Sequence, residues 1–263
     1  MVYCAIPSLT APLKAAKYCE KNRVNFIIDI QDIWLEAFRL VLNVPILREL
    51  MLHPLRLMAD EVYRSADDIC AVSRSYAAIA MKVNKQCVKP HIVYLGTSLS
   101  TFDTNVLNNP VEKPREELWL DYCGSLGKSY DIAVTIEALS ELNHNKVMAP
   151  KLIVMGDGEN RLKLENLAAE LKVNAIFTGR LQYHQMCGML AACDIAVNPI
   201  VGGAFQSIIN KHADYAAAGI PVLNTQESDE YRELVDRYSM RFYCNNSDAV
   251  SLTKNIQILM EDD

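Results

Sequence analysis

The sequence predicts an α/β protein built from two domains with parallel sheets. With 263 residues, the chain is long enough for two domains with sizeable cores. Short apolar runs typical of buried strands recur along it and alternate with segments of helical pattern. In the second half, three of these runs are followed by glycine-bearing turns, at the ends of strands where open parallel sheets bind ligands.

The composition is that of an ordinary soluble globular protein. Hydrophobic residues make up 51% and charged residues 22%, and the net charge of −6 argues against nucleic acid as a partner. The eight cysteines form no CxxC pair, which favours reduced thiols in a cytoplasmic protein over disulfides or a zinc site. No stretch approaches the roughly 20 apolar residues of a membrane span, and no signal peptide opens the chain.

The first half predicts one domain over residues 1–98. It begins abruptly with a buried strand, with no residues before it to frame that strand. The elements expected here are a strand at Val2–Ile6, a helix at Leu9–Asn22, a strand at Val24–Ile30, a helical stretch at Trp34–Arg64 broken by Pro45 and Pro54, a strand at Asp68–Val72, a helix from Ser73 and a strand at His91–Tyr94.

Two features of this half are candidates for ligand or surface binding. Asp29 and Asp32 sit at the carboxyl end of the second strand, where a ligand is expected, although turn and helix capping explains each acid as well. The stretch 34–64 interleaves four arginines with apolar residues. Such a surface suits peripheral contact with a membrane, and a solvated helical face with a buried side is the competing interpretation.

The second half predicts a doubly wound parallel sheet over residues 118–263, after an interdomain linker at 99–117. Its expected strands are Leu118–Cys123, Lys151–Met155, Ala175–Phe177, Asp194–Asn198, Val222–Asn224 and Arg241–Cys244, with helices between them. The three glycine-bearing turns are Gly124 to Lys128 with Gly127 inside it, Gly156-Asp157-Gly158, and Gly179-Arg180. Glycine lets backbone amides approach a phosphate closely, so the three turns in succession predict a nucleotide site.

A helix is expected from about Ser207 to Ala218. Ser207 is a plausible N-cap, Gly219 suits a left-handed C-terminal cap, and Pro221 ends the helix. The free amides near Ser207 and Ile208 would face a diphosphate at the positive end of the helix dipole.

Three polar residues in this region suggest how a ligand is held. Gln206 and Asp214 would lie roughly 12 Å apart along the helix, a distance that a sugar on a nucleoside diphosphate can span. Lys211 could add a positive charge, and Asp214 could accept both hydroxyls of a ribose. An ordinary crossover helix with a solvated Lys and Asp is the competing interpretation.

This stretch resembles the donor-binding helix of retaining GT-B glycosyltransferases of the family 4 type. Their signature is two acids separated by seven residues, with Gly-x-Pro shortly after the second. Asp214 matches the second acid, five residues before Gly219, whereas Gln206 replaces the first. The resemblance implies that Asp214 holds the ribose, and it supports the sugar-gripping role of Gln206 less well.

The resemblance also extends to the loops. It implies that Lys128 neutralises the leaving diphosphate together with Lys211, although Ser125 stands where the family often has an Arg. Arg180, Leu181 and Tyr183 match the region around the nucleotide base, with a plain core role as the alternative for the last two. Gln31, beside Asp29 and Asp32, stands where the acceptor domain often carries a His, so no acceptor-side catalytic His carries over.

By resemblance, the fold is GT-B, with two Rossmann-like domains of which the N-terminal one is incomplete, and the chain looks truncated at both ends. The implied activity is transfer of a hexosyl or related sugar from a nucleotide-sugar to a glycan or lipid-linked acceptor, with retention and without metal or cofactor, in cell-surface polysaccharide synthesis. A cytoplasmic protein is expected, with peripheral contact at the inner membrane face as an addition.

Two other functions share this architecture. A catalytically silent nucleotide-sugar-binding fragment and a GT-B sugar-nucleotide epimerase both remain open from the sequence. A nicotinamide-dependent dehydrogenase is disfavoured because neither Gly124-x-x-Gly127 nor Gly156-x-Gly158 completes the G-x-G-x-x-G fingerprint.

Overall fold

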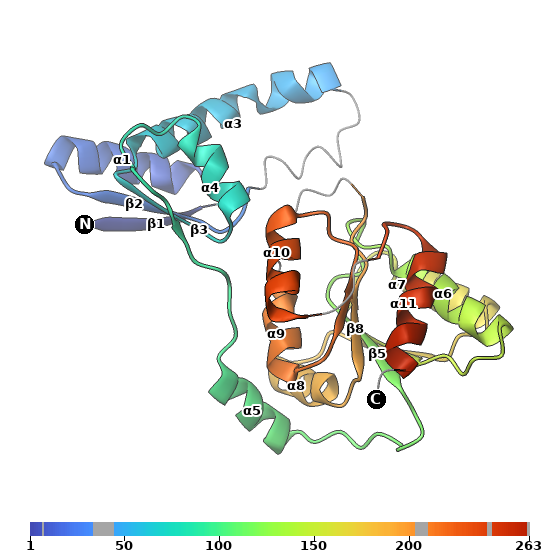
Figure 1. Ribbon diagram of the computed structural model, residues 1–263. Helices are drawn as coiled ribbons and strands as arrows, with labels where there is room; N and C mark the ends of the chain where they lie inside the picture. The colour runs from blue at the N-terminus through green and yellow to red at the C-terminus, as the bar shows by residue number, and fades with distance from the viewer. Residues whose placement is uncertain (7, 34–44, 203–209, 241–243, 262–263) are drawn as a thin grey trace. The chain divides into compact units, whose positions relative to one another are not determined.

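The computed structural model describes residues 1–6, 8–33, 45–202, 210–240 and 244–261. They form two compact units, one of residues 1–95 and one of the described residues from 96 onward (Figure 1). Each unit has its own parallel sheet, which confirms the predicted α/β class with two parallel sheets. The range 99–117, expected as a linker, differs from that expectation, because it contains helix α5 (Leu99–Asn108), which packs on α8 in the second unit.

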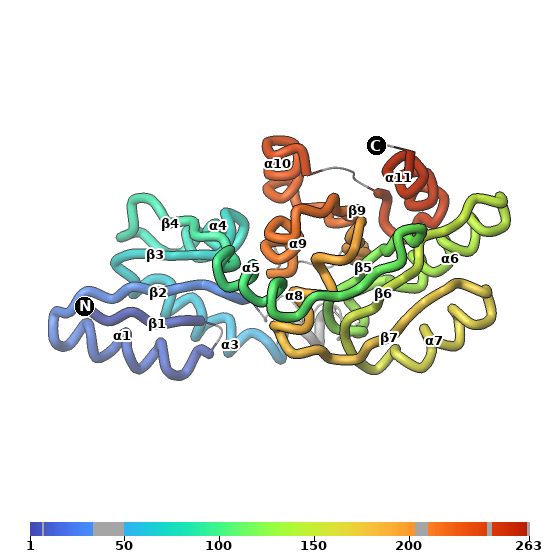
Figure 2. The backbone as a smooth tube through the Cα atoms, turned by 90° about the horizontal axis from the view of Figure 1, so that it is seen from below, coloured from blue at the N-terminus to red at the C-terminus, as the bar shows by residue number. Residues whose placement is uncertain are grey.

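Unit 1 is a four-stranded parallel sheet in the order β1-β2-β3-β4, seen side by side in Figure 2. Its core is apolar and includes Phe26, Ile28 and Ile30 from β2, all at most 1% exposed. The elements are β1 (Val2–Ile6), α1 (Thr10–Asn22), β2 (Phe26–Ile30), α3 (Pro45–Ser65), β3 (Asp68–Ala71), α4 (Arg74–Met81) and β4 (His91–Ile92).

Pro54 was expected to break the helical stretch, and that expectation is wrong. Helix α3 runs through Pro54 from Pro45 to Ser65. A proline inside a helix costs about 3 kcal/mol because it removes a hydrogen bond and crowds the preceding turn. Val62 and Tyr63 are buried in the core on the later half of α3, and burying apolar side chains of this size contributes about 1.5–3 kcal/mol each. Core packing therefore outweighs the local preference.

Unit 2 is a five-stranded parallel sheet in the order β7-β6-β5-β8-β9. Its strands are rich in apolar residues because helices cover both faces (Figure 1). Helices α6, α7 and α11 share one core, and α5, α8 and α9 share another on the opposite face. The elements after α5 are β5 (Trp119–Cys123), α6 (Ile132–His144), β6 (Lys151–Met155), α7 (Arg161–Glu170), β7 (Ala175–Gly179), α8 (Tyr183–Ala191), β8 (Ile195–Asn198), α9 (Lys211–Ala218), β9 (Val222–Asn224), α10 (Asp229–Tyr238) and α11 (Ala249–Glu261).

Within the described residues, helix α9 covers Lys211–Ala218, and the predicted start at Ser207 lies outside them. Its end is as predicted, since Gly219 takes φ +70 and its amide caps the last turn. The expected strand at 241–244 and the expected cap at Ser207 involve residues outside the described ranges. All eight cysteines are free thiols.

Candidate functional site

A pocket of about 560 Å³ opens at the carboxyl ends of β5, β6 and β7. We call it the loop pocket. It brings together most of the predicted loop residues with three sulfur-containing side chains from the sheet and α8. Its lining residues are Cys123, Gly124, Ser125, Met155, Gly156, Asp157, Gly158, Arg180, Leu181 and Met186. Gly127 and Lys128 belong to the first glycine-bearing turn, Gly124 to Lys128, which we call the first loop. They are not among the lining residues, and Lys128 is exposed.

The first loop is joined by backbone hydrogen bonds to the second loop, which is the turn Gly156-Asp157-Gly158. The Gly124 amide donates to the Met155 carbonyl at 2.9 Å, and the Leu126 amide donates to the Asp157 carbonyl at 3.0 Å. A Cβ at Gly156 would lie 1.7 Å from the Gly124 oxygen, and one at Gly158 would lie 2.7 Å from the Leu126 oxygen. These two glycines therefore allow the loops to pack on each other, a reason that the sequence analysis did not anticipate.

Arg161, at the start of α7, contacts both the second loop and the end of β7, which leads into the third loop, the turn Gly179-Arg180. Its guanidinium donates to the Phe177 carbonyl at 3.1 Å and to Glu165 at 2.8 Å, and it lies 3.7 Å from the Asp157 carboxylate. Its Nη1 is also 3.0 Å from where a Cβ on Gly179 would sit. The end of β7, just before Arg180, is thereby held against the second loop.

Asp214, predicted to hold a ribose, is fixed by two hydroxyl donors. Its Oδ1 accepts from Thr97 Oγ1 at 2.6 Å and from the Tyr183 hydroxyl at 3.0 Å. Burial is the main cause that raises the pKa of Tyr183 to about 12, and the Asp214 carboxylate adds to it. The Asp214 charge also acts on the Cys123 thiol, which lines the loop pocket, so Asp214 lies near that pocket.

Lys211 does not take the solvated position of the competing interpretation. Its ammonium nitrogen is shielded from solvent and has no hydrogen-bond partner among the described residues. It lies 4.4 Å from the centre of the Tyr122 ring and 3.9 Å from that of Tyr130. It would also be 2.8 Å from a Cβ on Gly124. Burial lowers the pKa of Lys211 to about 7.

Asp121 on β5 is a second buried charged residue in this region. It is fully buried, and its carboxylate oxygens have no hydrogen-bond partner among the described residues. Burial raises its pKa well above the usual range, while the charge of Lys211 acts in the opposite direction. The two groups influence each other electrostatically without forming an ion pair within 4 Å in the described structure.

A buried polar network lies under the ends of β8 and β9. His212 stacks on Tyr231 with ring centres 4.1 Å apart, and its Nδ1 lies 2.8 Å from the Tyr231 hydroxyl. Its Nε2 lies 3.4 Å from Asn198 Nδ2, which donates to Asn224 Oδ1 at 2.7 Å. Burial lowers the pKa of His212 to about 3, so the imidazole is neutral at pH 7.

In unit 1, the predicted acceptor-side residues are partly assembled. Gln31 Nε2 donates to Asp29 Oδ2 at 2.7 Å, which holds the two side chains together. Tyr3 also bonds Asp29, and burial together with this carboxylate raises the pKa of Tyr3 to about 12. Asp32 is exposed, and no contact of its side chain is described.

Three predicted residues, Gln206, Ser207 and Ile208, lie outside the described residues. Conversely, sequence reasoning missed Thr97 as a partner of Asp214, and Tyr122 and Tyr130 as neighbours of Lys211. No local pattern marks these residues. Thr97 and Asp214 are 117 positions apart, so only the folded unit brings them together.

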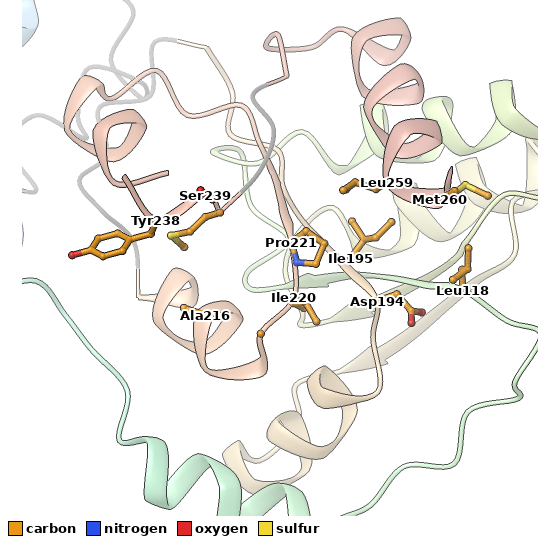
Figure 3. Close-up of a pocket in the computed structure, with 12 residues that line it drawn as sticks. Leu118, Asp194, Ile195, Ala216, Ile220, Pro221, Tyr238, Ser239, Leu259 and Met260 are labelled. Carbon is orange, nitrogen blue, oxygen red and sulfur yellow. The ribbon is translucent and has the colours of Figure 1, made fainter. Parts of the chain in front are cut away.

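A second cavity, of about 930 Å³, lies at the amino ends of β5, β8 and β9 (Figure 3). Apolar side chains such as Ile195, Pro221 and Leu259 make up much of its wall. Among the described residues that line it, the one carboxylate is that of Asp194, which already accepts from Lys113 Nζ at 2.6 Å and from the Trp119 amide at 2.7 Å. None of the predicted site residues lines this cavity.

None of the helices in the described ranges is long and apolar enough to cross a membrane. Within the same ranges, no three His, Cys, Asp or Glu side chains gather in a way that could hold a metal ion.

Comparison with solved structures shows the fold. HepE of Anabaena, solved with UDP, matches with a TM-score of 0.74 at 15% identity, over 99% of this chain and 69% of that one. The glycosyltransferase WaaG of lipopolysaccharide biosynthesis matches with a TM-score of 0.64 at 16% identity, over 94% of this chain and 72% of that one. The trehalose 6-phosphate synthase of Burkholderia multivorans matches with a TM-score of 0.67 at 10% identity, over 97% of this chain and 68% of that one. The predicted GT-B fold is thus confirmed.

A search of curated proteins finds no match. A family model described as "Glycosyl transferases group 1" matches residues 119–262, which is more than half of the chain and includes the loop pocket and Asp214. The likeness in fold and this match agree, and the chain belongs to the glycosyl transferases group 1 family.

Proposed function

We propose that unit 2 binds a nucleotide-sugar and that the protein transfers its sugar to a glycan or lipid-linked acceptor with retention of configuration. The observation that carries this proposal is the Asp214 carboxylate beside the loop pocket. Thr97 and Tyr183 occupy its Oδ1, while no partner of Oδ2 is described. A ribose with two neighbouring hydroxyls suits a carboxylate oxygen held in this way.

The positive charges near the first loop support a role in holding the diphosphate. Lys128 is exposed on that loop, and Lys211 lies against Gly124. Together with backbone amides of the loop, they would stabilise charge on the leaving group, so we propose a reaction that needs neither a metal nor a cofactor. Gln206 would contact the donor sugar.

The solved neighbours support the class of donor and the pathway. HepE is described with UDP, with UDP and glucose, and with UDP-glucose, and WaaB is described as a galactosyltransferase of the lipopolysaccharide outer core. We therefore propose a uridine nucleotide carrying a hexose, and a role in cell-surface polysaccharide synthesis.

The acceptor would be handled by unit 1, with Asp29, Gln31 and Asp32 on its side of the reaction. Peripheral contact of this cytoplasmic protein with a membrane is supported by α3, where Leu50, Met51 and Leu57 are 73%, 55% and 52% exposed. Exposed apolar side chains on an amphipathic helix suit insertion between lipid headgroups. Sedimentation with anionic vesicles checks this, since Leu57→Asp should weaken the binding.

The primary test is calorimetric titration with UDP, GDP and ADP, followed by NMR of the anomeric proton in the product formed from the matching nucleotide-glucose. We expect UDP to bind tightest and the new linkage to keep the α configuration of the donor. Binding without transfer to any acceptor would instead indicate a silent nucleotide-sugar-binding protein. Formation of an epimeric sugar without acceptor would indicate an epimerase. Absence of binding to all three nucleotides would disprove the proposal.

A further inference from the structure

The ammonium of Lys211 stands out among the cations of unit 2. It is buried, whereas Lys128 and Arg180 at the same edge of the sheet are exposed. No hydrogen-bond acceptor reaches it among the described residues. Burying an ammonium without a partner is costly, and such groups normally have one in folded proteins.

The aromatic rings beside Lys211 supply only part of the missing interaction. The Tyr122 and Tyr130 ring centres lie at 4.4 and 3.9 Å from Nζ, within the range of cation–π contacts. These contacts stabilise a cation weakly compared with an ion pair, with values near 2 kcal/mol when desolvated. They hold the side chain in place, but they leave its charge uncompensated.

Gly124 is what separates this ammonium from the loop pocket. Gly124 lines the pocket, and a Cβ on it would come within 2.8 Å of Lys211 Nζ. The Tyr122 hydroxyl donates to the Ser125 carbonyl at 2.7 Å, which fixes the loop over the lysine. Because residue 124 has no side chain, an anion on the pocket side of the loop can approach the ammonium closely, with little water between them.

Among the described residues, no acid accepts a hydrogen bond from the Lys211 ammonium. Asp121 is the acid on β5, and burial raises its pKa well above the usual range, which disfavours its charged form, while Lys211 acts in the opposite direction. Burial raises the pKa of Cys123 to about 12, so that thiol is neutral. The titratable groups described near Lys211 are Asp121, Tyr122 and Cys123 on β5, Tyr130 in the first loop, and His212, Asp214 and Tyr215 on α9.

We propose that Lys211 is a buried counter-charge for the diphosphate and that binding of a nucleoside diphosphate draws a proton from solvent onto its amine in those molecules that hold the amine neutral. The inference rests on the proposed function, because it assigns the anion to that same site. Its chemistry is simple: the free protein holds Lys211 partly as neutral amine, and the phosphate charge next to Gly124 favours the ammonium. Burial, which lowers the pKa of Lys211 to about 7, leaves both forms populated near neutral pH.

The experiment is calorimetric titration with UDP and with uridine, at pH 7.0 and 8.5, in buffers of different ionisation enthalpy. UDP is about 90% fully ionised at pH 7.0 and almost completely so at pH 8.5, because the second pKa of a terminal phosphate is near 6. In the wild type we expect net proton uptake with UDP and none with uridine. We also expect UDP affinity to fall by about tenfold from pH 7.0 to 8.5, because the neutral amine must first acquire a proton.

Lys211→Met should abolish both the proton uptake and the pH dependence. Methionine has a similar length, and replacing an uncompensated buried charge with an apolar side chain is expected to preserve the fold. Lys128→Met is the matched control, since it removes an exposed cation from the same loop. It should weaken UDP binding at both pH values while the proton uptake persists.

A measurement on the wild type alone guards against misfolding of the variant. NMR of side-chain-labelled lysine follows the titration of Lys211 directly, and UDP should move its midpoint upward. If UDP binds without proton uptake and without moving that midpoint, the inference is wrong while the proposed function stands. If none of the nucleoside diphosphates binds, the proposed function fails and the inference fails with it.

Discussion

Lys211 and Asp214 lie one turn apart on α9, yet their surroundings are opposite. The Lys211 ammonium is enclosed by two tyrosine rings and the first loop, whereas Asp214 accepts hydrogen bonds from two hydroxyls beside the loop pocket. A helical pattern in the sequence presents both as polar residues near the start of a helix. At the scale of single residues, their tertiary neighbours determine what each can do.

Replacing Asp214 tests the ribose role. Asp214→Ala should weaken UDP binding by about 1.5–3 kcal/mol, the range for a hydrogen bond to a charged group, which corresponds to roughly 10- to 150-fold. Calorimetry measures the change. Thr97→Val is the control, because it removes one donor and leaves the carboxylate, so its effect should be smaller. Equal affinity of Asp214→Ala and the wild type would show that the carboxylate does not contact the ligand.

His212 should make the stability of unit 2 depend on pH. The unfolded chain takes up a proton on this residue below about pH 6.5, but the folded protein does so only near pH 3, because burial lowers the pKa of His212. Stability therefore falls as the pH drops through this window. When the pH is lowered from 7.5 to 5, the free energy of unfolding measured with urea should fall by about 2 kcal/mol less in His212→Gln than in the wild type.

His184→Gln, at an exposed position on α8, is the matched control for the histidine experiment. A parallel pH dependence of His212→Gln and the wild type would mean that His212 is not kept neutral by the folded structure.

At the scale of elements, the first and second loops behave as one unit. Two backbone hydrogen bonds and the close approach of Gly156 to the Gly124 carbonyl join them. The two joined loops therefore form one rigid wall of the loop pocket at the ends of β5 and β6. A rigid site loses less conformational entropy on binding than separate flexible loops would.

Two glycine substitutions test whether the first and second loops pack on each other. Gly156→Ala places a methyl group 1.7 Å from the Gly124 oxygen, so the backbone must move, and we expect a loss of about 2–3 kcal/mol in stability together with weaker UDP binding. Gly127→Ala meets no atom within 4 Å and should change stability by less than about 0.5 kcal/mol. Urea unfolding compares the two. Equal effects would show that the loops are not joined as described.

Several elements could be predicted from the sequence with close boundaries. The strands Lys151–Met155 and Val222–Asn224 agree with their predicted ends, because buried parallel strands are continuous apolar runs between polar turns. The continuity of α3 through Pro54 could not be predicted. It depends on packing between distant segments, and local breaker signals do not contain that information.

At the scale of the whole molecule, the chain has a separate core for each sheet. The core of unit 1 centres on β2 and α3, and unit 2 has one core on each face of its sheet. Separate cores allow the two units to unfold separately.

Nucleotide should therefore stabilise the units unequally. At a UDP concentration of 100 times Kd, linkage adds about 2.7 kcal/mol to the unit that binds it. Hydrogen exchange followed by mass spectrometry should show slower exchange in peptides from β5, β6 and β8, whereas peptides from β1 and β2 should keep the rate they have without nucleotide. Equal added protection in both sheets would contradict binding by unit 2.

The candidate site was predictable only in outline. The glycine turns and Asp214 could be placed at one edge of the sheet because the carboxyl ends of parallel strands meet there. The burial of Lys211 could not be predicted, since it depends on Tyr122, Tyr130 and Gly124 lying above it in the folded unit. Thr97 as the partner of Asp214 could not be predicted either, because Thr97 lies at the end of the range 1–98 that the sequence assigns to the first domain.

The bond between Thr97 and Asp214 also has a consequence for the order of folding. It closes a chain segment of 117 residues that contains β5 through β8, so it cannot persist until the sheet has formed. Contacts so distant in sequence form late because the entropy of loop closure must be overcome first. In stopped-flow refolding, the ability to bind UDP should therefore appear after the far-UV circular dichroism signal has recovered, and a newly made chain would acquire its ligand only once α9 has been synthesised and docked.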